Sequence, residues 1–271
     1  MTVQKPAKVV LEGRTISTKA LWAEGGSQIV VGGADTETVT IAGDENTVGL
    51  SSMRFNGEEE GTSVTVTAKD IQVSTAGSDD TLSAIWGQNN TQSETAPEGA
   101  ASVTLKGDTI HIQSPGTAIV AFSNSQININ GDTTIDAGKY AVDTRGHATT
   151  NINTDGAHKT VIKGDILFET PATTGDSKNS GNIVDANVNL NLTGSDSSWT
   201  GKSYQKDGET EIPTSESGSD FYGDVTGFNL TLKDGAAWKV TGDSFVNGIH
   251  GQDGVVDLGD GAKTVIAGKV E

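Results

Sequence analysis

The decapeptide Val184-Asp185-Ala186-Asn187-Val188-Asn189-Leu190-Asn191-Leu192-Thr193 alternates apolar and polar residues without a break. In an extended chain, successive side chains point to opposite sides. Every apolar residue of this stretch therefore falls on one face and every polar residue on the other. The pattern predicts a β-strand with one face in a core and the other in water.

The same alternation recurs in shorter stretches along the chain, each ended by Gly, Asp or Ser. These residues favour tight turns, and 35 glycines among 271 residues are nearly twice the usual share of ~7%. No 3.6-residue apolar period persists, so we expect an all-β protein. The stretches are residues 64–67, 103–105, 110–112, 127–129 and 228–232.

A related apolar segment returns several times, followed in each copy by a polar loop and an alternating strand. Ile85, Ile119 and Val142 occupy the same place in three copies and lie 34 and 23 residues apart. Unequal units are typical of a solenoid whose coils carry insertions. The sequence therefore predicts a right-handed, single-stranded parallel β-helix, a solenoid with loop insertions. The segments are residues 20–23, 82–86, 117–122 and 140–143.

An antiparallel β-sandwich stays open as the structural alternative. A sandwich would favour two-residue hairpin turns between strands at regular spacing. Asn56-Gly57 and several Asp-Gly pairs supply the residues that such turns need. The direction of strand pairing decides between the two folds.

Three stretches are rich in Ser, Thr, Gly, Glu and Asp and carry few large apolar residues. They lie near residues 88–99, 170–181 and 203–220. Because the repeat pattern resumes after each, we expect loops extruded from the coils and not linkers between domains. Residues 1–271 are therefore predicted to form a single β-helix.

A formal charge of -18 restricts the class of partner. Contacts to phosphate need Lys and Arg, and the sequence contains no basic run, so a nucleic-acid partner is not expected. The absence of Cys excludes disulfides and thiolate metal sites, and it suits a protein that crosses an oxidising compartment unfolded. Residues 1–6 lack the apolar core of a signal peptide, and no apolar run approaches the ~18 residues that span a bilayer.

Residues 230–244, LTLKDGAAWKVTGDS, combine a leucine-rich strand, a small turn, a Trp and Val-Thr-Gly-Asp-Ser. A weaker copy occupies residues 190–201, and residues 254–258 look like the next coil. This repeat resembles that of autotransporter passenger domains of the pertactin and AIDA-like type. The resemblance implies a rod that is exported across the outer membrane of a Gram-negative cell and displayed at the surface or released. The translocator β-barrel that would connect it to the membrane is expected to be absent from these residues, since no set of long membrane-type strands follows Leu258.

Each Trp of this repeat is expected at the edge of a coil, where it covers the stack, with Gly-Asp-Ser forming a tight turn. The expectation covers Trp199 and Trp238. The aromatic rings would then screen the ends of the strands from water.

Many β-helices act on polysaccharides, and such an enzyme would carry a recognisable pattern of catalytic residues. Asn153-Thr154-Asp155, Asp79-Asp80 and Gly146-His147 occur in the wrong order for a polygalacturonase-like hydrolase. Gly175-Asp176-Ser177 and Gly242-Asp243-Ser244 lack the following Gly of a serine-protease nucleophile turn. We therefore expect a protein that is not an enzyme.

Metal and cofactor sites are not expected either. No pair among His111, His147, His158 and His250 has the spacing of a zinc helix, and His111 falls on the polar face of a strand. The oxygen-rich stretches at residues 77–80 and 257–261 match no calcium loop.

The densest run of charge is Glu58-Glu59-Glu60, which is the candidate binding site for a basic partner or else a solvated loop tip. The predicted function is adhesion or cell–cell self-association of a surface-displayed, extracellular passenger. Its partner would be a host receptor or glycan, or a second copy of the chain. The alternative is a β-helix enzyme or binder that acts on extracellular glycans; a trimeric phage fibre ranks third.

Overall fold

The computed structural model describes residues 1–4, 6–54, 61–79, 82–89, 101–145, 148–169, 186–207, 210–211, 227–261, 263 and 265–270. Every regular element in this part of the chain is a β-strand. All but one of the strand pairings in these residues are parallel, and each parallel pairing joins segments that lie 18 or more residues apart in sequence. The prediction of an all-β protein is confirmed, and parallel pairing excludes the antiparallel sandwich.

The strands form three parallel ladders, which we name A, B and C in the order in which the chain visits them. Ladder A consists of β1 (Thr2–Val3), β4 (Leu21–Glu24), β7 (Leu50–Arg54), β9 (Ile85–Asn89), β11 (Ile119–Phe122), the ends of β12 (Ser125–Arg145) and β14 (Thr160–Glu169), and β17 (Ser203–Asp207). Ladder B consists of β2 (Lys8–Leu11), β5 (Gln28–Gly32), the beginnings of β8 (Thr62–Ser74), β10 (Ala101–Ser114) and β12, then β13 (Thr149–Ile152), β15 (Asn187–Thr193), β19 (Phe228–Lys233) and the end of β21 (Ser244–His250). Ladder C consists of β3 (Thr15–Thr18), β6 (Thr38–Ala42), the ends of β8 and β10, the middle of β12, the beginning of β14, then β16 (Ser198–Gly201), β20 (Ala237–Val240) and β22 (Val255–Asp257).

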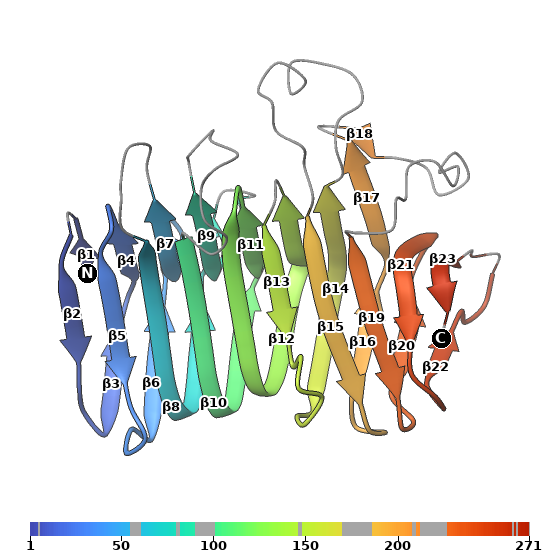
Figure 1. The fold of residues 1–271 in the computed structure, drawn as a ribbon, viewed down its shortest axis with the longest axis horizontal. Helices are drawn as coiled ribbons and strands as arrows, with labels where there is room; N and C mark the ends of the chain where they lie inside the picture. The colour runs from blue at the N-terminus through green and yellow to red at the C-terminus, as the bar shows by residue number, and fades with distance from the viewer. Residues whose placement is uncertain are drawn as a thin grey trace.

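One passage of the chain through ladders A, B and C is called a layer. Figure 1 shows the layers following one another along the long axis, from the blue N-terminal end to the red C-terminal end. The shape is solenoid-like, and its last strand, β23 (Val265–Val270), pairs with β21. Within the described residues, one strand pair is antiparallel: it joins β17 to the short β18 (Thr210–Glu211), which projects from the stack in Figure 1.

The core consists of inward columns, in which one residue per layer stacks on its partner in the next. One column of ladder B passes through β5, β8, β10 and β12, and its members are all fully buried. β-Branched and leucine side chains suit this position because they pack well on the pleated surface of a sheet. The members are Ile29, Val64, Val103 and Ile127.

The register of ladder A agrees with the repeat seen in the sequence. Ile119 pairs with Ile85 on one side and with Val142 on the other, so the spacings of 34 and 23 residues each mark one complete layer. The column extends back to Leu21 and Leu50. Layers of unequal length therefore keep ladder A in register, and the register shifts that do occur lie at the corners within the long strands β10 and β12.

The C-terminal repeat pairs as the sequence predicts, but its tryptophans are placed differently. Leu190 pairs with Leu230, and Trp199 pairs with Trp238. Both indoles are fully buried and lie stacked at 4.5 Å with an interplanar angle of 9°. The expectation that they cover the edge of the stack is wrong, since they belong to an inward column of ladder C.

The predicted insertions coincide only in part with the described residues. Gln88 and Asn89 complete β9, and residues 203–207 form β17, which pairs with β14 in ladder A. Those residues belong to coils and not to loops, so the prediction is wrong there. Residues 90–99, 170–181, 208–209 and 212–220 lie outside the described part of the chain.

Candidate functional site

A row of asparagines runs along the outer side of ladder B. Asn128, Asn151, Asn189 and Asn229 pair in register over four layers. Each amide donates to the one before it: Asn151 Nδ2 to Asn128 Oδ1 at 2.9 Å, Asn189 Nδ2 to Asn151 Oδ1 at 2.9 Å, and Asn229 Nδ2 to Asn189 Oδ1 at 3.2 Å. Such a chain fixes the side chains in one orientation. We name these four residues the asparagine ladder.

Two outward columns of ladder B, that of the asparagine ladder and the one beside it, are polar but uncharged. Thr65 and Thr104 continue the same column toward the N-terminus. The next outward column carries no carboxylate over five layers, and its members are Ser63, Ser102, Gln126, Thr149 and Asn187. In a chain with a net charge of -18, these two columns form a neutral strip.

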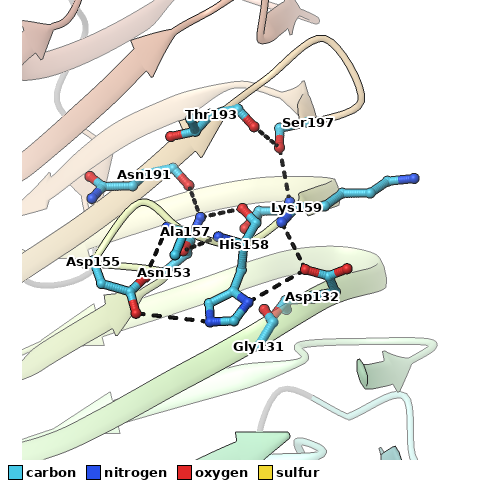
Figure 2. Close-up of polar contacts among 12 residues, drawn as sticks. Gly131, Asp132, Asn153, Asp155, Ala157, His158, Lys159, Asn191, Thr193 and Ser197 are labelled. Carbon is cyan, nitrogen blue, oxygen red and sulfur yellow. Dashed lines mark hydrogen bonds and ion pairs between the residues drawn. The ribbon is translucent and has the colours of Figure 1, made fainter. Parts of the chain in front are cut away.

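A turn at residues 153–159 lies beside the asparagine ladder, between β13 and β14 (Figure 2). Asn153 is fully buried and adopts a φ of 52°, a conformation that Asn tolerates better than most residues. Its Nδ2 donates to the carbonyl of His158 at 2.6 Å and to that of Asn191 at 3.1 Å, and its Oδ1 accepts from the His158 N–H at 3.0 Å. The Asn153 side chain therefore holds the turn closed and connects it to the next layer.

The imidazole of His158 lies between two carboxylates, one from this turn and one from β12, as Figure 2 shows. His158 Nδ1 is 3.5 Å from Asp132 Oδ1, and Nε2 is 3.9 Å from Asp155 Oδ2. The N–H of Ala157 donates to Asp155 at 3.0 Å and holds the pKa of that carboxyl below its usual range. Asp132 also accepts the N–H of Lys159 at 3.0 Å. These contacts stabilise a partly exposed turn and place no nucleophile beside the imidazole.

A groove follows the corner at which the chain leaves ladder C and enters ladder A. We name this line of turns the C–A corner. A cavity of about 410 Å³ and another of about 480 Å³ adjoin at Gly138, which lines both. The first is lined from Gly43 through Ala76 and Pro115. The second continues through Gly164 and Gly201 to Thr241, so together they follow seven layers.

Backbone atoms form the floor of the groove because glycine is required at the corner. A Cβ on Gly138 would lie 1.9 Å from the Pro115 carbonyl oxygen, and one on Gly201 would lie 2.2 Å from that of Gly164. The tryptophans support this floor from below. Trp199 Nε1 donates to the Gly164 carbonyl at 2.9 Å, and Trp238 Nε1 donates to the Gly201 carbonyl at 3.0 Å.

The structure separates the residues singled out in the sequence. Glu58, Glu59 and Glu60 lie outside the described residues, as do His147 and residues 175–177. His111 is exposed on the outer side of ladder C, which confirms that prediction. Ser244 is buried, and its hydroxyl donates to the Gly242 carbonyl at 2.9 Å.

Comparison of the chain with family models, with curated proteins and with solved structures finds no match. In the described residues, no helix has the length and apolar character to cross a membrane. No cluster of three or more His, Asp or Glu side chains with the geometry of a metal site occurs in that same part.

Proposed function

We propose that this chain is a right-handed parallel β-helix from the passenger region of a Gram-negative autotransporter, displayed at the cell surface for adhesion or self-association. The handedness follows from a general rule, because crossovers between parallel strands of one sheet are right-handed in about 98% of cases. The resemblance of residues 230–244 to passenger repeats supports the family. The register of Trp199 with Trp238 is consistent with a true repeat.

The observation that carries the function is the neutral strip around the asparagine ladder. Two copies in antiparallel contact would bring amides and hydroxyls of one strip against those of the other. Each contact is weak, but many of them form at once because the strip repeats over several layers, and together they give a strong association. No single residue needs to dominate such a surface.

Charge explains why this strip and not another surface would mediate contact. Two chains of net charge -18 repel each other, and the repulsion is weakest where both surfaces are uncharged. Added salt screens the remaining repulsion over a Debye length of ~10 Å at ~0.1 M. Self-association is therefore expected to strengthen as salt rises to ~0.1 M.

A settling assay tests the proposal. The chain is displayed on a bacterium that normally stays dispersed, and settling is followed by turbidity. We expect displaying cells to settle, and the double substitution Thr104→Glu and Gln126→Glu to abolish settling, because like charges then face each other across the contact. Both side chains point outward from ladder B, so the core is unchanged.

The matched control places two carboxylates on ladder C, at the exposed residues Gln72 and Thr134. Gln72→Glu with Thr134→Glu adds the same charge and should leave settling unchanged. Equal loss of settling in both variants would show that net charge, not the strip, governs association. Dispersed wild-type cells would contradict self-association and leave attachment to a host surface as the adhesive function.

A further inference from the structure

We propose that Trp22, Ser51 and Trp86 form a site that binds one neutral sugar ring, such as the terminal hexose of a glycan. We name these three residues the tryptophan slot. The slot lies on the outer side of ladder A and is separate from the neutral strip of ladder B, so it does not depend on the proposed self-association.

The three residues belong to one outward column of ladder A. Trp22 pairs with Ser51, and Ser51 pairs with Trp86. The residues before the two tryptophans, Leu21 and Ile85, are buried in the core, so alternation directs both indoles outward. Each indole keeps part of its surface exposed. The column therefore presents two aromatic side chains with a small polar one between them.

The spacing along this column suits a sugar ring between the indoles. One layer lies between the two tryptophans, and two ladder steps of about 4.8 Å place their backbones about 9.6 Å apart. Two stacking contacts of about 3.5–4.0 Å each need about 7–8 Å. A ring therefore fits between two indoles that stand out from the sheet, and serine at the intervening position adds little bulk to the floor.

Two polar atoms of the slot lack hydrogen-bond partners within the described part of the chain. Ser51 is only 1% exposed, and its hydroxyl makes no hydrogen bond there. The Nε1–H of Trp22 is likewise buried without an acceptor. A buried polar group without a partner destabilises the fold, so such groups occur most often where a ligand or water satisfies them. Sugar hydroxyls both donate and accept, and would satisfy both atoms.

The two indoles differ in how firmly they are held. Trp86 Nε1 donates to Gln88 Oε1 at 2.9 Å, which fixes one wall of the slot. Trp22 Nε1 has no such bond in the described residues, so the Trp22 ring is the one that would turn outward. Because the two unsatisfied atoms are covered in this structure, that turn would expose them as the sugar enters.

The charge beside the slot favours an uncharged ligand. Glu24 stands two residues after Trp22, on the same side of β4, and accepts from Gln4 Nε2 at 2.7 Å. A carboxylate here, in a chain of net charge -18, repels acidic sugars and phosphates. A quaternary ammonium, another kind of ligand that indoles bind, offers no acceptor to the Trp22 N–H. A neutral sugar meets both conditions.

Tryptophan fluorescence of the whole chain tests the proposal, with methyl glycosides of glucose, galactose, mannose and N-acetylglucosamine as probes. Trp199 and Trp238 are fully buried, so a change of emission during titration reports on Trp22 and Trp86. We expect at least one of the four glycosides to change the emission saturably. Methyl glucuronide and choline should leave the emission unchanged.

Two substitutions of Ser51 show whether the sugar lies in the slot. Ser51→Ala removes the unsatisfied hydroxyl and should weaken binding about three- to tenfold, the cost of one hydrogen bond, without lowering the midpoint of urea unfolding. Ser51→Leu fills the space between the indoles and should abolish binding. The matched controls Ser63→Ala and Ser63→Leu alter an outward serine of ladder B and should bind as the wild type does.

Three results would overturn the proposal. These are no saturable change of emission with any of the four glycosides, equal affinity of Ser51→Ala and the wild type, or binding of choline or methyl glucuronide as tight as that of the best neutral glycoside. The titrations use the soluble chain and not displayed cells. Failure of self-association therefore leaves their outcome unaffected.

Discussion

One inward column of ladder C changes from aliphatic to aromatic side chains at a single step, where Ile162 pairs with Trp199. Before the step, the column consists of stacked Ile and Val; after it, Trp199 and Trp238 are joined by nearby phenylalanine rings. The aliphatic members are Ile41, Val73, Ile112, Ile135 and Ile162. Both regions have the same register and the same depth of burial.

The two regions differ in how strongly they depend on a particular side chain. An aliphatic member contributes apolar area and shape, and a similar apolar side chain can replace most of that. Trp199 and Trp238 also donate to corner carbonyls one layer back, so each has a partner that no other apolar residue can satisfy. The aromatic region is therefore expected to respond more sharply to single substitutions.

The largest effect is expected from Trp238→Ala. The substitution removes a buried ring stacked at 4.5 Å, leaves a cavity and deprives the Gly201 carbonyl of its donor. A loss of about 3–5 kcal/mol in the free energy of unfolding is expected for such a change. Urea unfolding followed by circular dichroism measures it.

Trp86→Ala is the matched control for that variant, because Trp86 is only half-buried and lies on the outer side of ladder A. Trp86→Ala should therefore lower the free energy of unfolding by clearly less than Trp238→Ala does. If Trp238→Ala lowered the free energy of unfolding no more than Trp86→Ala does, the stacked tryptophans would not make the aromatic region more sensitive to substitution than the aliphatic one.

A moderate effect is expected from Ile135→Val in the aliphatic region. One methylene is lost from a fully buried side chain that has no polar partner, so about 0.5–1.5 kcal/mol of stability should be lost. The same urea experiment measures the change. A loss as large as that of Trp238→Ala would mean that the aliphatic column is packed as specifically as the aromatic one.

The smallest effect is expected from Asp155→Asn, in the turn that precedes β14 at the boundary of the two regions. The folded-state pKa of Asp155 is lowered, chiefly by the Ala157 N–H, so its contribution is present above the unfolded value of ~3.9 and is lost as pH falls through the folded value. The side chain is 46% exposed, so water screens the interaction and the cost at pH 7 should be at most about 0.5 kcal/mol.

Thermal unfolding of wild type and Asp155→Asn between pH 7 and pH 2 tests this prediction. The gap between the two midpoints should be present at neutral pH and close at the acid end. If the difference between the two midpoints were larger at pH 2 than at pH 7, the pKa of Asp155 would be raised by folding and not lowered.

Apolar alternation and repeat spacing were sufficient to predict the strands and part of their register. Ile85, Ile119 and Val142 pair as expected because inward positions must stack to bury their side chains. The placement of the tryptophans was missed, although the signal was present. Trp238 stands two residues before Val240, so alternation places both on the same inward side.

The groove and the His158 turn could not be predicted in the same way. Lys139, Lys163 and Lys202 share a cavity only because the intervening layers have particular lengths, and the residues between strands follow no period that would reveal those lengths. Asp132 and His158 lie 26 residues apart for the same reason. Local pattern determines which residues face inward, whereas layer length determines which residues meet at a corner.

The unequal layers have a mechanical consequence. Hydrogen bonds between layers run along the long axis, so tension between the two ends loads the ladders in series and detaches the end layers first. Each layer then releases a length of chain set by its own residue count. At about 3.4 Å per residue, the layer from Ile119 to Val142 releases about 80 Å and the layer from Ile166 to Ser203 about 125 Å. Under force, the molecule would lengthen in steps whose sizes record the order of its layers.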